Sequence, residues 1–433
     1  MMHRLVRYGF AVVVVAAACS RSTLFSLPNG HYGAGGAGGA GGAGGAGGAG
    51  GEGGAGGAPS GWPCPLAVDG PLGVAGGGTF SQRQPRLAYS SDNKNTVTLA
   101  MEWTMGTASP SELRHTSFAP WGTWPSSPLG LSYRANFDAG VSFAIAQSPK
   151  DHFALAMTDG TKPGDPEGIL LSPSMVPGAS DIPTAQSVDD GVGVLFATGQ
   201  ANRYLLGLVN ASTTEPASIR TVASAGASLA LGTRWPLACG TPRSADATAS
   251  GKGWWVVTSA VDGTFGNLSC DGLATSKPNR VILARVDVGL GVPALGTVFL
   301  ATGTVRQVVI EALSEKAPWL GWLDDAGAHV VSVNGATGAI TGGPYTVPAA
   351  LTDERLVLVP FFDGVLVARG SDGSVSYVAA DGKVSLPLVV KQLTGLNVFD
   401  ALPSPKGDAA LISLTGAGTV GTVEVARLRC EAP

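Results

Sequence analysis

Short apolar bursts separated by turn residues recur along the chain from about residue 60 onward. They include residues 194–196, 254–257, 281–283, 356–359 and 365–367. Each burst has the length of a strand and is rich in β-branched or aromatic residues, which is typical of buried strands. Stretches with a helical period are scarce, and the best of them, residues 306–316, reads as a strand followed by a loop. The pattern therefore predicts an all-β domain.

Asp-Gly pairs punctuate these bursts. They begin at Asp159, Asp190, Asp262, Asp363, Asp372 and Asp381. The Asp-Gly pair favours a type I′ turn, because that turn needs positive φ at both of its central residues. We therefore expect antiparallel strands that are joined by hairpins.

One internal repeat suggests the architecture. Two Ser-Pro-Lys turns, at Ser148 and Ser404, each lead into an apolar burst, and they lie 256 residues apart. Similar bursts between them make the copies five units apart, with a mean unit of about 51 residues, a plausible length for a four-stranded propeller blade. A further unit around Leu99 brings the count to seven. We predict a β-propeller of seven blades, with six or eight as the alternatives.

At these turns the chain resembles TolB-like and WD-repeat-like propellers, in which a Ser-Pro-Asp-Gly-Lys type of turn precedes a blade strand. Residues 330–338 are similar to the strand and turn of quinoprotein-type repeats. The resemblance covers only short turns, and Lys replaces the usual Asp. It implies a fold and not an activity, because propellers host many unrelated functions.

The N-terminal residues read as an export signal. Two arginines precede an apolar run over residues 9–18, which is far shorter than the roughly 20 residues that a membrane-spanning helix needs. The run ends in Ala16, Ala17, Ala18 and Cys19. This resembles the bacterial lipobox, whose Cys is acylated and becomes the new N-terminus, although Ala16 stands where Leu is usual. The alternative is an ordinary Ala-x-Ala cleavage site and simple secretion.

The cysteine count bears on the same question. Five cysteines are present, Cys19, Cys64, Cys239, Cys270 and Cys430, and lipidation of Cys19 removes the odd one. Three pairings of the other four are possible. We favour Cys239 with Cys270, and Cys64 with Cys430, since a propeller brings its chain ends together.

Between the signal and the domain lies a Gly-Ala tract over residues 33–58, broken once by Glu52. With no apolar side chain beyond Ala, such a tract cannot offset the entropy of ordering, so we expect a disordered tether. About 40 residues of this composition span roughly 35 Å. The domains are therefore a signal peptide (1–18), a lipid-anchored tether (19–60) and the propeller (61–433).

The composition narrows the function. Charged residues make up 13% of the chain and its net charge is −4. Nucleic-acid binding requires a basic patch, and the sequence contains none. No nucleophile elbow, phosphate loop or metal-ligand spacing occurs, and the pairs at Asp189 and Asp324 read as turn residues. We expect no cofactor and no metal, and we name no catalytic residue.

The most suggestive binding residues are Trp121 and Trp124, in a Pro-bounded loop, which would offer a stacking platform to a sugar ring or an apolar anchor of a partner. Packing between blades is the alternative, as we expect for Trp254, Trp255, Trp319 and Trp322. The sequence indicates a monomeric, lipid-anchored envelope protein, at the outer membrane in a Gram-negative host, that binds a protein or glycan. The alternative is an exported glycan lyase or hydrolase with its site in the channel.

Overall fold

The computed structural model describes much of the chain between residues 61 and 430. The described residues are 61–79, 86–89, 97–103, 111–119, 121, 132–137, 143–147, 152–156, 167–171, 186–187, 192–200, 203–210, 214–225, 228–240, 244–250, 253–273, 275–287, 292–312, 317–347, 355–369, 373–390, 397–404, 406–415 and 420–430. The predicted signal peptide and tether, with Cys19, lie outside these residues.

The described residues form seven four-stranded antiparallel sheets. The first three sheets are β2 (Arg86–Tyr89), β3 (Val97–Trp103), β4 (Ser111–Phe118) and β5 (Ser132–Phe137); β6 (Phe143–Gln147), β7 (His152–Ala156), β8 (Glu167–Leu171) and β9 (Gln186–Ser187); and β10 (Val192–Gln200), β11 (Arg203–Asn210), β12 (Ala217–Ala225) and β13 (Ser228–Ala238).

The next three sheets are β14 (Ala245–Ser250), β15 (Gly253–Ala260), β16 (Arg280–Asp287) and β17 (Pro293–Leu300); β18 (Gln307–Glu311), β19 (Trp319–Asp324), β20 (Gly327–Val333) and β21 (Ile340–Val347); and β22 (Leu356–Phe361), β23 (Gly364–Arg369), β24 (Ser374–Val378) and β25 (Leu388–Val389). The seventh joins the two ends of the domain and consists of β26 (Asn397–Pro403), β27 (Ala409–Thr415), β28 (Val420–Cys430) and β1 (Leu66–Thr79).

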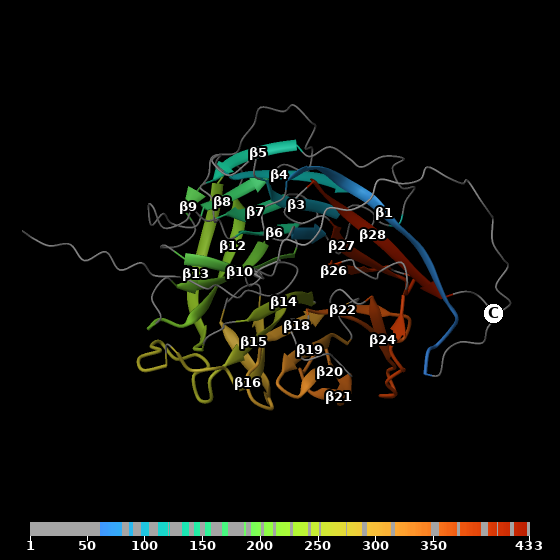
Figure 1. The fold of residues 1–433 in the computed structure, drawn as a ribbon. Coiled ribbons are helices and arrows are strands. Elements are labelled where there is room, and N and C mark those ends of the chain that lie inside the picture. The colour runs from blue at the N-terminus through green and yellow to red at the C-terminus, as the bar shows by residue number, and fades with distance from the viewer. Residues whose placement is uncertain are drawn as a thin grey trace, which may run out of the picture.

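These sheets are the blades of a β-propeller (Figure 1). The first strands contact one another in chain order, from β2 through β6, β10, β14, β18 and β22 to β26. The first strands therefore form the inner wall, and the fourth strand of each blade lies at its outer edge. The all-β propeller expected from the sequence is confirmed.

Burial falls from the inner strands to the outer ones. Every residue of β15, β19, β22 and β23 is buried, whereas most residues of β17 and β21 are exposed or half-buried. Strands such as β22 and β23 are covered on both faces because each blade packs between two others, so their sequences are nearly continuous apolar runs that do not alternate. Trp254, Trp255, Trp319 and Trp322 are buried, as the sequence predicts.

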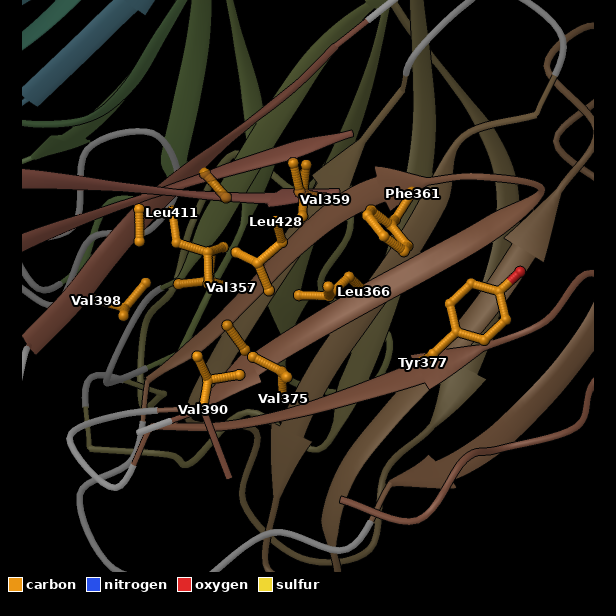
Figure 2. Close-up of a cluster of buried hydrophobic side chains, with 14 of the residues drawn as sticks. Val357, Val359, Phe361, Leu366, Val375, Tyr377, Val390, Val398, Leu411 and Leu428 are labelled. Carbon is orange, nitrogen blue, oxygen red and sulfur yellow. The ribbon is translucent and has the colours of Figure 1, made fainter. Parts of the chain in front are cut away.

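A large apolar cluster lies between the last two blades (Figure 2). Val357 and Val359 of β22 and Leu366 of β23 pack with Leu411 of β27 and Leu428 of β28. Burying a side chain of this size contributes about 1.5–3 kcal/mol. The cluster thus holds the blade that contains both chain ends against the blade that precedes it.

The residues just before β1 extend the same cluster. The Trp62 ring stacks on the Tyr377 ring with centroids 6.0 Å apart, and its Nε1 donates to the carbonyl of Leu386 over 3.3 Å. The Tyr377 hydroxyl donates to the Asp363 carboxylate. Burial, and secondarily that carboxylate, raises the pKa of Tyr377 far above its usual value.

The outer strand of the last blade comes from the start of the domain. β1 pairs with β28 in antiparallel register, from Leu66 opposite Cys430 to Thr79 opposite Val420. Cys64, just before β1, forms a disulfide with Cys430. Their Cα atoms are 5.4 Å apart, although the two residues are 366 positions apart in the chain. This is the pairing that the sequence analysis favours, and it links the chain ends covalently within one blade.

The blade of β14–β17 is joined to the next blade through a tight turn. Trp255 Nε1 donates to the carbonyl of Gly335 over 3.0 Å, and the Arg285 guanidinium lies 5.4 Å from the centroid of the Trp255 ring. Gly338 has a φ of +71° and packs on this ring, so that a Cβ there would lie 2.7 Å from Trp255 Cη2. The turn is the 330–338 stretch that the sequence analysis singled out.

Replacing Gly338 by alanine is expected to lower the free energy of unfolding by about 2–4 kcal/mol, because the Cβ clashes with an aromatic ring and also strains the backbone. Gly263 is a matched control, since its φ is +73° and a Cβ there meets nothing within 4 Å. Gly263→Ala should cost only the backbone term, about 1 kcal/mol. Urea unfolding measures both, and equal losses would contradict the packing argument.

Candidate functional site

Polar side chains on the inner wall connect successive blades. Ser244 Oγ accepts from the backbone N–H of Val308 over 3.0 Å, and Asp246 Oδ2 accepts from the N–H of Ile310 over 2.8 Å. Gln307 does the same one blade further on, accepting from the N–H of Leu356 and donating to its carbonyl, both over 2.8 Å. These side chains satisfy backbone groups at the edge of the neighbouring first strand. In this part of the wall they act structurally.

The carboxylates of Asp324 and Asp325 also accept hydrogen bonds from backbone N–H groups. Asp324 is buried at the end of β19, where its Oδ2 accepts from Thr302 N–H over 2.9 Å and from Trp322 Nε1 over 3.2 Å. Its Oδ1 accepts from Ala326 N–H over 2.8 Å and lies 3.0 Å from His329 Nε2. The exposed Asp325 accepts from Thr304 N–H over 2.8 Å. The pair fixes the connection from β17 to β18, in agreement with its interpretation as turn chemistry.

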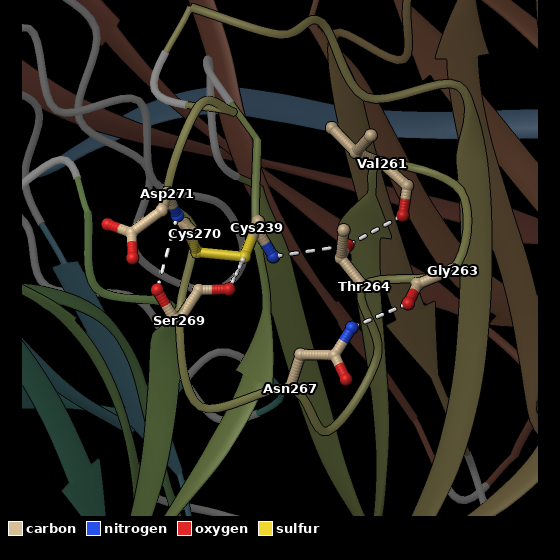
Figure 3. Close-up of a disulfide and its surroundings, with 8 residues drawn as sticks. All are labelled: Cys239, Val261, Gly263, Thr264, Asn267, Ser269, Cys270 and Asp271. Carbon is tan, nitrogen blue, oxygen red and sulfur yellow. Dashed lines mark hydrogen bonds between the residues drawn. A yellow bond between two sulfur atoms is a disulfide. The ribbon is translucent and has the colours of Figure 1, made fainter.

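The most distinctive surface feature is the loop of residues 261–279, which joins β15 to β16. Cys270 of this loop forms a disulfide with Cys239, which follows β13 of the preceding blade, with Cα atoms 5.6 Å apart (Figure 3). We call residues 261–279 the stapled loop. The sequence analysis favours this disulfide, but it gives the loop no role and takes Asp262-Gly263 for a hairpin turn.

Hydrogen bonds add to the disulfide. The N–H of Gly266 donates to the carbonyl of Leu237 over 2.9 Å, and the N–H of Cys270 donates to the carbonyl of Thr214 over 2.6 Å. Both acceptors belong to the preceding blade. At the base of the loop, Asp262 and Arg280 form an ion pair of 2.8 Å. The loop therefore lies across the boundary between two blades and is tied to both.

The disulfide and these hydrogen bonds fix the backbone on either side of Leu268. It lies between the anchored Gly266 and Cys270, and 82% of its surface is exposed. Its neighbours Asn267 and Ser269 are exposed and polar. The Asn267 side chain donates to the carbonyl of Gly263 over 2.6 Å, which stiffens the tip further (Figure 3). An apolar side chain on a fixed backbone loses little conformational entropy when a partner covers it.

The other residues named from the sequence are only partly placed. Trp121 is a half-buried turn residue between β4 and β5, and Trp124 lies outside the described residues, as does Cys19. The structure therefore does not bring the two tryptophans together in a described site. Within the described ranges, no three His, Cys, Asp or Glu side chains are grouped so that they would hold a metal ion. Nor does any helix among these residues have the length and apolar character to span a membrane.

No protein-family model matches the chain, and no curated protein matches it. Solved structures resemble it at low identity. YCF48 bound to a D1 peptide is 10% identical with a TM-score of 0.45, over 85% of this chain and 97% of that one. The WD40 domain of coronin from Toxoplasma gondii is 10% identical with a TM-score of 0.49, over 85% of this chain and 88% of that one. A protein from Lactobacillus plantarum is 11% identical with a TM-score of 0.45, over 77% and 99%. At these values the similarity concerns the fold and carries no inference about activity.

Proposed function

We propose that the chain is an exported binding protein of the cell envelope, anchored by a lipid on Cys19, whose propeller recognises a partner protein through the stapled loop. The observation that carries the recognition is Leu268, an apolar side chain 82% exposed on a backbone held by the Cys239–Cys270 disulfide. A small rigid apolar tip suits an apolar pocket on a protein better than the face of a sugar ring, which aromatic side chains cover.

The two disulfides support the exported location and the anchor. Such bonds persist in oxidising compartments and are rare in the cytosol. They use four of the five cysteines, which leaves Cys19 for an acyl chain. A flexible tether then lets an anchored propeller reach a partner at a distance from the membrane.

A photo-crosslinking amino acid at position 268, introduced into the full chain in its host, tests the recognition site. We expect one discrete crosslinked protein from position 268. Position 386 is the control, because Leu386 is similarly exposed but lies in the loop between β24 and β25. We expect no crosslinked protein from this position. With that protein purified, Leu268→Ala should weaken binding about 30-fold, the loss typical of a hot-spot residue, without changing the unfolding temperature.

Equal crosslinking at positions 268 and 386, or an unchanged affinity for Leu268→Ala, would rule out the stapled loop as the recognition site. The anchor is checked on the same preparation by the mass of its N-terminal peptide. An acylated peptide that begins at Cys19 supports anchoring, and a peptide without acyl groups contradicts it.

A further inference from the structure

β17 is the outer strand of the fourth blade, and its surface is unusually apolar. Leu295, Val298 and Leu300 are exposed over 55%, 49% and 72% of their surfaces, and Val292 just before the strand over 42%. Contiguous exposed aliphatic residues of this kind usually mark a contact with another molecule. Among the described strands, β17 is also an edge strand, since no other strand pairs with its outer side.

Leu295, Val298 and Leu300 share one side of the strand, because their partners on β16 are alternate residues of that strand. Phe299 is buried against Val281 and Trp322, between this blade and the next. Val298 stands opposite Ile282, whose side chain packs with Ala238 and Ala260 on the side of the preceding blade. Because side chains alternate along a strand, Val298 and Leu300 project to that second side, beyond the area that the preceding blade covers.

β17 lacks the features that protect the other outer strands from pairing with a further strand. No charged residue occurs between Asp287 and Arg306. β5 contains Arg134, β13 contains Arg234, and β1 contains Asp69 and three register irregularities. β9 and β25 have two residues each, and β21 carries Pro344 in its interior. Charges, prolines, irregularities and short length are the devices that keep edge strands from pairing with other chains. β17 has a single irregularity and a proline only at its first position.

We propose that β17 is a homodimerisation edge, on which two copies of the chain pair their β17 strands antiparallel about a two-fold axis. A two-fold axis sets a strand against itself, so a charged edge such as that of β13 would oppose its own charge in the second copy. An uncharged edge is complementary to itself. Pairing also gives the outer backbone groups hydrogen-bond partners and brings the exposed aliphatic residues of the two copies together. This inference does not depend on the proposed ligand or anchor, and it differs from the monomer expected from the sequence.

Sedimentation of the full chain in a density-matched detergent, over a wide range of concentration, tests the proposal. We expect a reversible monomer–dimer equilibrium. The double variant Leu295→Lys with Val298→Lys should weaken it at least about 100-fold, because it restores a charged edge. Val389→Lys on β25 is the control, since Val389 is 61% exposed on another outer strand, and it should leave the equilibrium unchanged. Thermal unfolding confirms that each variant is folded.

Amide hydrogen exchange provides the second measurement. In the dimer, outward-facing amides within residues 294–300 should exchange more slowly as the concentration rises. A chain that stays monomeric at every concentration overturns the proposal, and so does a dimer that the double variant leaves intact. Protection of β17 that appears only when an envelope protein is added would assign the edge to a foreign strand and would equally overturn self-pairing.

Discussion

Replacing Cys64 and Cys430 together by serine is expected to lower the free energy of unfolding by about 6 kcal/mol. In the chain-entropy model, the stabilisation by a disulfide grows with the length of the loop it closes, and this one joins residues 366 positions apart. Without it, β1 is held by its pairing with β28 and by the contacts of Trp62. Thermal and urea unfolding of the double variant measure the loss.

The second disulfide is the matched control, because Cys239 and Cys270 are only 31 positions apart. Serine at both positions should cost about 3.5 kcal/mol in the same model. Limited proteolysis then separates the two effects. The first variant should release the N-terminal segment, and the second should be cut within the stapled loop. If the Cys239 and Cys270 variant is the less stable of the two, loop length does not govern the stabilisation.

Asp324→Asn is expected to cost about 3 kcal/mol, although the two side chains are almost the same size. Each carboxylate oxygen of Asp324 faces two groups, and three of these four contacts are N–H donors that point at it. An amide must direct its NH₂ group at one of these two pairs of contacts, so at least one N–H donor loses its acceptor and the buried charge is lost. Urea unfolding monitored by tryptophan fluorescence also reports on Trp322, which lies in this network.

The adjacent Asp325→Asn provides the comparison. Asp325 is exposed and accepts one backbone hydrogen bond, from Thr304, so its replacement should cost less than about 1 kcal/mol. Similar losses at the two positions would show that the connection from β17 to β18 is not held by the buried carboxylate.

Much of the fold is readable from the sequence because the inner strands are covered on both faces. β15 and β19 each contain a buried apolar run, and their tryptophans are buried, as expected. The repeat is also genuine, since the turns before β7 and β27 both join the first and second strands of blades that are five apart. The apolar burst at Leu195 does not occupy the same place in its blade as the others. It lies on a first strand, whereas the bursts at Trp255 and Leu320 lie on second strands.

Turn geometry is less well predicted. At Asp363-Gly364 the sequence predicts positive φ at both residues, but the structure has it at Phe362, with a φ of 53°. Gly364 is already a strand residue, and a Cβ on it would clash with the carbonyl oxygen of Val378 and lie 2.8 Å from the Tyr377 hydroxyl. Glycine is needed here because of close contacts with β24, and the local sequence pattern does not reveal these contacts.

The candidate site was hardly predictable for a related reason. Asp262-Gly263 has the local signature of a tight hairpin, yet it opens a loop of 19 residues that a neighbouring blade holds in place. The importance of Leu268 depends on exposure and on anchors that are distant in sequence. Cys270 was the only local signal for it.

The origin of β1 sets an order of events during synthesis. Its partner β28 is made some 350 residues later, so the first strand to emerge is the last to be paired. Five of its fourteen residues are glycine, which weakens strand formation. We expect this composition to disfavour premature pairing of β1 with another blade before β28 has been made. The last blade can then form only after the whole chain has been delivered, which makes its completion a late step of maturation.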